Sequence, residues 1–97
     1  MTQRIRRALL FMPGDERRKI EKGAGLDLDT VIMDLEDGVA LNHKPNARRT
    51  IRLALSEVDF GRTERLVRVN PISQDGRFLE DVEQTIEGQP DGYVIPK

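Results

Sequence analysis

The stretch Thr30-Val-Ile-Met-Asp-Leu-Glu-Asp37 joins a short β-branched and apolar run directly to three carboxylates. A continuous apolar run of this length is typical of a parallel strand buried on both faces. In α/β barrels the chemistry gathers at the C-terminal edge of such strands. We therefore expect Asp34, Glu36 and Asp37 to lie at a sheet edge that carries a functional site.

Three further segments repeat this pattern, in which an apolar run ends in turn-forming or polar residues. They are Ala8-Leu-Leu-Phe-Met12 before Pro13-Gly14, Leu66-Val-Arg-Val69 before Asn70-Pro71, and Gly92-Tyr-Val-Ile95 before Pro96-Lys97.

Helical patterns separate the predicted strands. The first is predicted to begin after Asp15, as N-cap, and to end at Gly23 or Gly25. The second has Pro45 in its first turn, and the third ends before Gly88, the predicted C′ residue. The predicted apolar positions are Ala47, Ile51, Ala54, Leu55 and Val58 in the second helix, and Phe78, Leu79, Val82 and Ile86 in the third.

This alternation of strands and helices predicts an α/β fold with a parallel sheet. Four strands and three helices amount to half of a TIM (β/α)₈ barrel, which takes ~250 residues in all. The last strand would expose an apolar edge unless more sheet followed. We expect residues 1–97 to form one partial (β/α)₈ barrel domain, the N-terminal half of a longer chain. A complete, flavodoxin-like four-strand domain is the alternative.

The composition of the chain bears on which partners and which cell compartment it suits. Sixteen basic and seventeen acidic residues give a net charge of −1, which disfavours a nucleic-acid partner. No stretch approaches the ~20 apolar residues of a membrane span, and residues 1–7 lack the apolar core of a secretory signal. The absence of cysteine excludes a disulfide framework and fits a reducing compartment. We expect a cytoplasmic protein without membrane contact.

Five motifs recur in a characteristic order and spacing. They are Arg7-Ala-Leu-Leu-Phe-Met-Pro-Gly14, Asp34-Leu-Glu-Asp-Gly-Val-Ala40 followed by Lys44 and Ala47-Arg48, Asp59-Phe-Gly61, Val67-Arg-Val-Asn70, and Ile95-Pro-Lys97. In this order they resemble the N-terminal motifs of the citrate lyase β-subunit and malyl-CoA lyase group of the HpcH/HpaI aldolase family.

The resemblance implies a TIM barrel that assembles into homotrimers or homohexamers. It implies a Mg²⁺-dependent lyase that cleaves or forms a carbon–carbon bond in a 3-hydroxyacyl thioester such as malyl-CoA, citramalyl-CoA or a citryl thioester. In that family a glutamate and an aspartate from later strands hold the metal, so the expected metal ligands lie beyond Lys97. A 2-oxo acid aldolase of the same family that works without coenzyme A, and a non-catalytic assembly module, are the alternatives.

Arg68 is the predicted catalytic residue. It interrupts an apolar strand, and an unpaired buried charge is very costly, so its side chain must be paired or face the barrel mouth. The resemblance implies that Arg68 binds the carboxylate of a 2-oxo acid such as glyoxylate, oxaloacetate or pyruvate. An internal ion pair with Asp34 or Glu36 is the alternative.

Phe11 and Lys22 match family positions that contact the thioester. The resemblance implies that Phe11 lines the pocket and that Lys22 reaches a phosphate of coenzyme A; core packing and a solvated surface position are the alternatives. Glu16, followed by Arg17 and Arg18, stands where several malyl-CoA lyases have an arginine, so a carrier-protein thioester or a shifted basic contact stays open.

The remaining polar residues carry weaker signals. Glu36 and Asp37 are expected to orient the magnesium shell or its waters, or else to pair with Arg68 or Lys44. His43 is predicted to be a surface residue. Lys97 suits a Schiff-base aldolase, but the resemblance favours metal-assisted chemistry.

Overall fold

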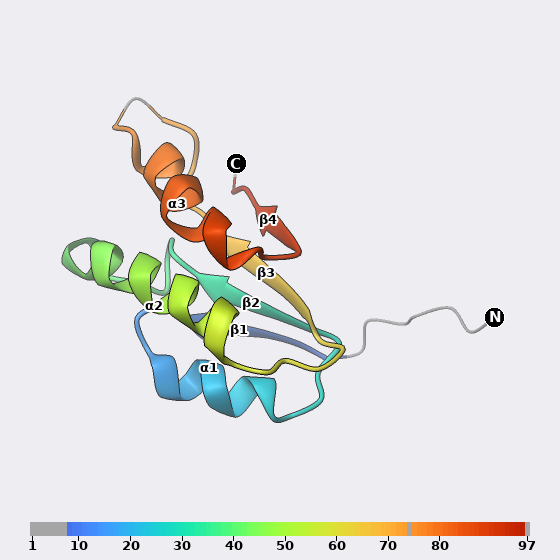
Figure 1. Cartoon of the computed structure of the whole chain (residues 1–97). Helices are drawn as coiled ribbons and strands as arrows, with labels where there is room; N and C mark the ends of the chain where they lie inside the picture. The colour runs from blue at the N-terminus through green and yellow to red at the C-terminus, as the bar shows by residue number, and fades with distance from the viewer. Residues whose placement is uncertain (1–7, 74, 97) are drawn as a thin grey trace.

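The structure is a computed structural model, and it describes residues 8–73 and 75–96. Strands and helices alternate along these residues (Figure 1). The elements are β1 (Leu9–Pro13), α1 (Arg17–Ala24), β2 (Thr30–Asp34), the 3₁₀ turn η1 (Leu41–His43), α2 (Lys44–Glu57), β3 (Glu64–Arg68), α3 (Arg77–Thr85), the 3₁₀ turn η2 (Ile86–Gly88) and β4 (Gly92–Val94). The four strands and three helices predicted from the sequence are confirmed.

The strands form one parallel sheet in the order β1-β2-β3-β4. All three α-helices lie on the same side of this sheet (Figure 1). A flavodoxin-like sheet has the strand order 2-1-3-4-5 and helices on both faces, so that alternative is wrong. Consecutive parallel strands with an outer layer of helices are the arrangement of half of a (β/α)₈ barrel.

Alternation along the strands gives the sheet two distinct faces. Toward the helices, Met12, Met33 and Val67 are buried and pack with Ile20 of α1 and Ile51 of α2. The residues between them point to the opposite, helix-free face. In a barrel this face lines the interior, and it carries Phe11, Asp34 and Arg68.

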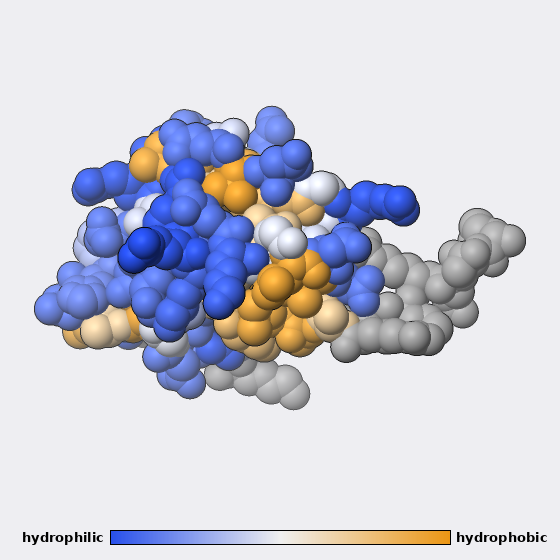
Figure 2. All heavy atoms as spheres, turned by 90° about the horizontal axis from the view of Figure 1, so that it is seen from below, coloured by the Kyte–Doolittle hydropathy of each residue, from blue (hydrophilic) through white to orange (hydrophobic). Residues whose placement is uncertain are grey.

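Exposure differs sharply between the strands. All five residues of β2 are buried. The apolar run Val31–Met33 predicts this for its centre, and the polar residues at its two ends, Thr30 and Asp34, are buried as well. At the sheet edge, Leu9 and Phe11 of β1 are exposed, together with Leu26 after α1. An apolar area shows on the underside of the molecule (Figure 2). In the described part of the chain, no helix has the length and apolar composition needed to cross a bilayer.

The start of α1 differs from the prediction. Glu16, not Asp15, occupies the N-cap position, and it makes no side-chain capping bond. The Asp15 carboxylate instead lies 3.1 Å from Nδ1 of His43. A turn closed by the Glu16 amide on the Pro13 carbonyl delays the helix. The predicted stop at Gly25 is confirmed, because its amide bonds the carbonyls of the last turn.

The third helix also departs from its apolar pattern. Leu79 and Ile86, predicted on the buried face, are 61% and 52% exposed, whereas Asp81 and Thr85 are fully buried. The left-handed residue after the helix is Gln89 rather than Gly88. A side chain at Gly88 would meet Leu55 of α2, its Cβ 2.8 Å away.

Close packing at Gly14 gives a stability prediction. A Cβ at this position would lie 2.6 Å from the Asp34 carbonyl oxygen, so Gly14→Ala should destabilise the protein by about 1–3 kcal/mol through overpacking. Gly25→Ala is the matched control, because its Cβ would lie 3.6 Å from the nearest atom. Urea unfolding of both variants tests this, and equal effects would contradict it.

Candidate functional site

An ion pair between Asp34 and Arg68 joins the C-terminal ends of β2 and β3. The two residues are partners in the parallel register. Nε of Arg68 donates to Oδ1 of Asp34 at 2.9 Å, and Nη2 donates to Oδ2 at 2.7 Å. The contact is therefore bidentate, which fixes both distance and orientation. The ion pair weighed from the sequence forms, with Asp34 as the partner.

The carboxylate of Asp34 is fully engaged. Its oxygens also accept the backbone amides of Glu36 at 2.9 Å and Gly38 at 2.7 Å. Burial raises the pKa of Asp34, but the bonds from Arg68 and from the two amides outweigh it, so the pKa lies below its ordinary value. With four donors on two oxygens, Asp34 has no lone pair left for a metal ion.

Arg68 keeps one edge of its guanidinium available. The group has five N–H donors, and Asp34 takes those on the side that carries Nε. Nη1 and the second hydrogen of Nη2 form an end-on edge, for which the described residues provide no hydrogen-bond partner. The Arg68 side chain is 23% exposed, and Asp34 raises its pKa by hydrogen bonding to the charged form. This edge can hold a second carboxylate without breaking the first contact.

Phe11 lies beside this arginine. Cζ of Arg68 is 4.8 Å from the centroid of the Phe11 ring, within the range of a cation–π contact. Phe11 also lines a hollow of about 160 Å³ with Pro13, Asp34 and Gly38. The structure therefore brings Phe11 and Arg68 together at one end of the sheet.

Lys22 lies farther out, on the exposed side of α1. It lines a groove of about 290 Å³ that runs between α1 and the free edge of β1. Phe11 lines the same groove, as do Lys19 and Leu26. The Lys19 ammonium is paired with the Glu16 carboxylate at 3.2 Å, so Lys22 is the cation that this groove offers to the anionic group of a ligand with a hydrocarbon chain.

The acids after β2 do not form a metal site by themselves. Glu36 is half-buried, with Oε1 3.9 Å from Nε of Arg68, and Asp37 is exposed. The described residues contain no group of three side chains suited to holding a metal ion. Lys97, considered for Schiff-base chemistry, lies outside the described residues. His43 is exposed as predicted.

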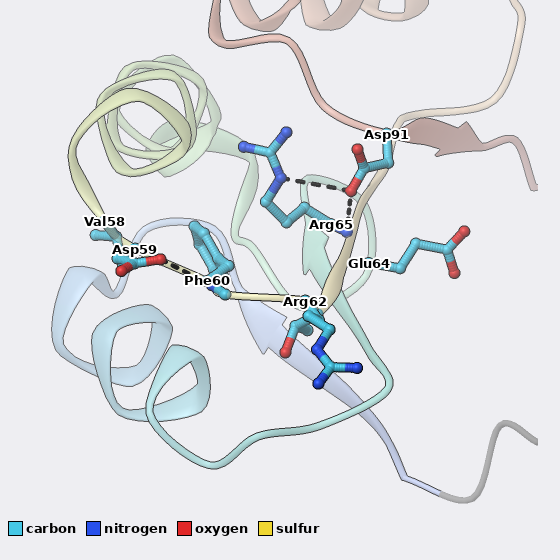
Figure 3. Close-up of a pocket in the computed structure, with 9 residues that line it drawn as sticks. Val58, Asp59, Phe60, Arg62, Glu64, Arg65 and Asp91 are labelled. Atoms are coloured by element: carbon cyan, nitrogen blue, oxygen red, sulfur yellow. Dashed lines mark hydrogen bonds and ion pairs between the residues drawn. The ribbon is translucent and has the colours of Figure 1, made fainter. Parts of the chain in front are cut away.

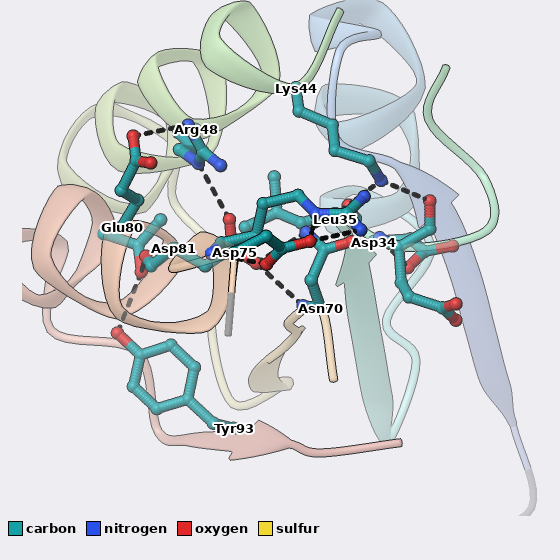
Figure 4. A network of polar contacts seen from close by, with 12 residues as sticks. Asp34, Leu35, Lys44, Arg48, Asn70, Asp75, Glu80, Asp81 and Tyr93 are labelled. Carbon is teal, nitrogen blue, oxygen red and sulfur yellow. Dashed lines mark hydrogen bonds and ion pairs between the residues drawn. The ribbon is translucent and has the colours of Figure 1, made fainter. Parts of the chain in front are cut away.

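Lys44 is a buried residue that sequence reasoning did not assign to the site. Its ammonium donates to the carbonyls of Leu35 at 2.7 Å and Glu36 at 2.8 Å (Figure 4). Burial lowers its pKa. Lys44 thus holds the backbone just after Asp34. The sequence indicates Lys44 only through its place in the second motif and as an alternative ion-pair partner of Glu36 or Asp37.

A hollow larger than the two beside Phe11 lies at the opposite end of the strands (Figure 3). It measures about 570 Å³ and surrounds the start of β3, where Arg65 bonds Asp91 and the carbonyls of Leu55 and Gln89. Residues at the N-terminal ends of barrel strands serve stability rather than chemistry. We therefore assign the site to the Asp34–Arg68 end.

Consecutive parallel strands, an outer layer of helices and charged side chains at the C-terminal strand ends are the arrangement of (β/α)₈-barrel proteins. Comparison with known proteins gives the family. The chain belongs to the HpcH/HpaI aldolase/citrate lyase family, whose model matches residues 7–97.

Individual relatives agree with this assignment. The chain is 42% identical over 94 residues to the mitochondrial citramalyl-CoA lyase of Homo sapiens, covering 95% of this chain and 27% of that protein. It is 41% identical over 92 residues to a (3S)-malyl-CoA thioesterase of Cereibacter sphaeroides, covering 94% and 32%. The chain therefore spans about a third of the length of the curated relatives it matches.

Solved structures show the same fold. Protein CitE from Mycobacterium tuberculosis in complex with magnesium and acetate superposes with a TM-score of 0.76 at 32% identity, covering 95% of this chain and 37% of that one. The same protein in complex with magnesium, acetoacetate and coenzyme A gives 0.64 at 32% identity, covering 96% and 34%.

The charge on Asp34 gives a pH prediction. Because the folded state lowers its pKa, Asp34 stabilises the fold fully above the unfolded pKa of ~3.9 and loses this effect as pH falls through the folded pKa. Asp34→Asn should therefore cost about 2–3 kcal/mol at pH 7. Its deficit relative to the parent protein should shrink in acid.

Urea unfolding at neutral and acid pH measures this deficit. Asp37→Asn is the control, because Asp37 is exposed and its replacement should have little effect at either pH. A deficit for Asp34→Asn that does not change with pH would contradict the assignment.

Proposed function

We propose that this chain supplies the first half of the barrel of a Mg²⁺-dependent carbon–carbon lyase that acts on a 3-hydroxyacyl-CoA thioester of the citramalyl or malyl type. The observation that carries the proposal is the guanidinium of Arg68. It is held on one edge by Asp34 and leaves its other edge without a partner among the described residues. Family membership and the named relatives support the chemistry.

The geometry of Arg68 suits a 2-oxo acid. A planar guanidinium binds a carboxylate through two parallel N–H···O bonds, and the end-on edge offers such a pair. Asp34 and the ring of Phe11 restrict the guanidinium, so little orientational freedom is lost on binding. Lysine cannot form this fork.

The reaction would balance as follows. In cleavage, the hydroxyl on the carbon next to the carboxylate loses its proton and becomes the carbonyl of the 2-oxo acid. The adjacent carbon–carbon bond breaks, and its electron pair passes to the thioester as an enolate, which is then protonated. Arg68 would bind the carboxylate beside the carbon that becomes the carbonyl, which places a fixed positive charge near the reacting oxygen.

The proposal includes Mg²⁺ because solved structures of a similar protein contain it. The M. tuberculosis protein is a magnesium complex, and a bound Mg²⁺ supplies Lewis-acid polarisation of the oxo group. Of the described acids, Glu36 fits a supporting place best. It is half-buried and faces Arg68, and carboxylates commonly accept bonds from waters around hard cations. Asp37 is less suited because it is exposed.

The thioester carrier is proposed to be coenzyme A. The groove beside Lys22 has an apolar floor and a basic rim, which matches a pantetheine arm with a phosphate. A carrier-protein thioester and a coenzyme A-independent aldolase are the alternatives. Homotrimeric or homohexameric assembly and a cytoplasmic location remain predictions.

A second candidate is thioester hydrolysis, since the C. sphaeroides relative is named a malyl-CoA thioesterase. Product analysis separates the two. The complete enzyme, given malyl-CoA or citramalyl-CoA and Mg²⁺, should release a 2-oxo acid and leave the thioester intact. Release of free thiol with an intact hydroxy acid would favour hydrolysis, and no reaction on either substrate would overturn both.

Replacement of Arg68 tests its role in the reaction. Arg68→Lys keeps the charge but loses the fork, so kcat/KM should fall by roughly 10²-fold or more, ~3 kcal/mol. The melting temperature should fall only modestly, since the lysine can still approach Asp34. A variant with near-normal turnover and a much lower melting temperature would show that Arg68 serves only the fold.

Replacement of Lys22 tests the coenzyme A groove. Lys22→Ala should raise KM for the acyl-CoA more than it lowers kcat, as the loss of uniform binding does. Arg18→Ala is the matched control, because Arg18 is an exposed cation on α1 that does not line the groove. Equal KM values for the parent and Lys22→Ala, with activity on a carrier-protein thioester, would favour the citrate lyase β-subunit alternative.

A further inference from the structure

The buried face of α3 is polar, although an apolar face could serve the same packing role in the fold. Asp81 is fully buried, and burying a carboxylate costs several kcal/mol unless it is well paired. Apolar side chains in the same place often stabilise a protein as well or better. The contacts of Asp81 therefore call for another explanation.

The carboxylate of Asp81 joins α2 to the end of β3. Oδ1 accepts Nε of Arg48 at 2.7 Å. Oδ2 accepts both the backbone amide and the side-chain amide of Asn70, each at 2.7 Å (Figure 4). Asn70 lies two residues after Arg68 and is itself buried. Asp81 thus fixes the chain where it leaves the proposed site.

The same network reaches the segment after β2. The side-chain amide of Asn70 also donates to the carbonyl of Leu35 at 3.0 Å, and the Lys44 ammonium donates to the same carbonyl at 2.7 Å. The amide of Leu35 in turn bonds the carbonyl of Arg68 at 2.9 Å. These hydrogen bonds therefore connect the backbone that follows Asp34 to the backbone that follows Arg68.

We propose that Asp81, held by Arg48, is a positioning residue that sets the orientation of the Arg68 guanidinium from the outer layer of helices. The proposal rests on the proposed function, in which Arg68 binds the 2-oxo acid. A misplacement of about 1 Å can cost 10²-fold in rate. A rigid link between the ends of β2 and β3 would keep the Arg68 guanidinium within that tolerance.

The first test is Asp81→Asn in the complete enzyme, assayed in the condensation direction. KM for the 2-oxo acid should rise by roughly 10-fold or more, while KM for the acyl-CoA should stay within about twofold. Glu80→Gln is the matched control. Its carboxylate also contacts Arg48, at 3.3 Å, but it is 61% exposed, and its replacement should leave both KM values unchanged.

A second variant guards against a folding defect in the first. Asn70→Ala keeps the backbone amide on Asp81 but removes the side-chain amide bonds to Asp81 and to the Leu35 carbonyl, and it should raise KM for the 2-oxo acid in the same selective way. Unchanged kinetics in both variants, or equal changes in the two KM values, would overturn the proposal even if stability falls.

Hydrogen exchange separates this proposal from the proposed function. The amides of Glu36 and Gly38 bond Asp34, so Asp81→Asn should speed their exchange more than that of α1. This result would support the link even in an enzyme that does not use 2-oxo acids. Faster exchange confined to α3 would overturn the proposal whatever the substrate.

Discussion

The structure depends on one constraint: Arg68, the partly buried arginine that ends β3, needs a partner for its charge. Arg68 finds it in Asp34 on the neighbouring strand, and the pair sits at the end of the sheet where barrels carry chemistry. Several other features follow from this contact. Gly38 lacks a side chain where a Cβ would lie 2.7 Å from the Asp34 carboxylate. The amides of Glu36 and Gly38 complete the set of donors around that carboxylate.

The ion pair and a substrate contact need not exclude each other, because a guanidinium has more than one edge that can bind a carboxylate. Asp34 takes the Nε side, and this orients the end-on edge. Two further features favour a site at this end of the sheet. The Phe11 ring packs against Arg68, and Lys44 and Asn70 bond the backbone just after Asp34. In the larger hollow at the start of β3, Arg65 is already bonded to Asp91 and to the carbonyl of Gln89, so the size of that hollow does not make it the better candidate site.

Much of the fold could be predicted from the sequence, because apolar runs and helical spacing report burial directly. The run at 30–34 predicted the inner strand β2. Pro45, together with the apolar residues at helical spacing that follow it, predicted α2. The pattern failed in α3, where Asp81 is buried by virtue of Arg48, a partner 33 positions away that periodicity cannot reveal. The choice between substrate and ion pair for Arg68 also stayed open, since the register that opposes it to Asp34 is set by the sheet. The sequence suggested Lys44 only as an ion-pair partner of Glu36 or Asp37, whereas its actual partners are backbone carbonyls, which no sequence pattern indicates.

The most direct measurement is a crystal structure of the complete enzyme with Mg²⁺ and a 2-oxo acid such as pyruvate. If Arg68 works as we propose, Asp34 will remain on Nε and Nη2 while the carboxylate of the bound acid occupies Nη1 and the free side of Nη2. A structure in which the 2-oxo acid binds away from Arg68, or in which Arg68 must release Asp34 to reach it, would contradict this arrangement.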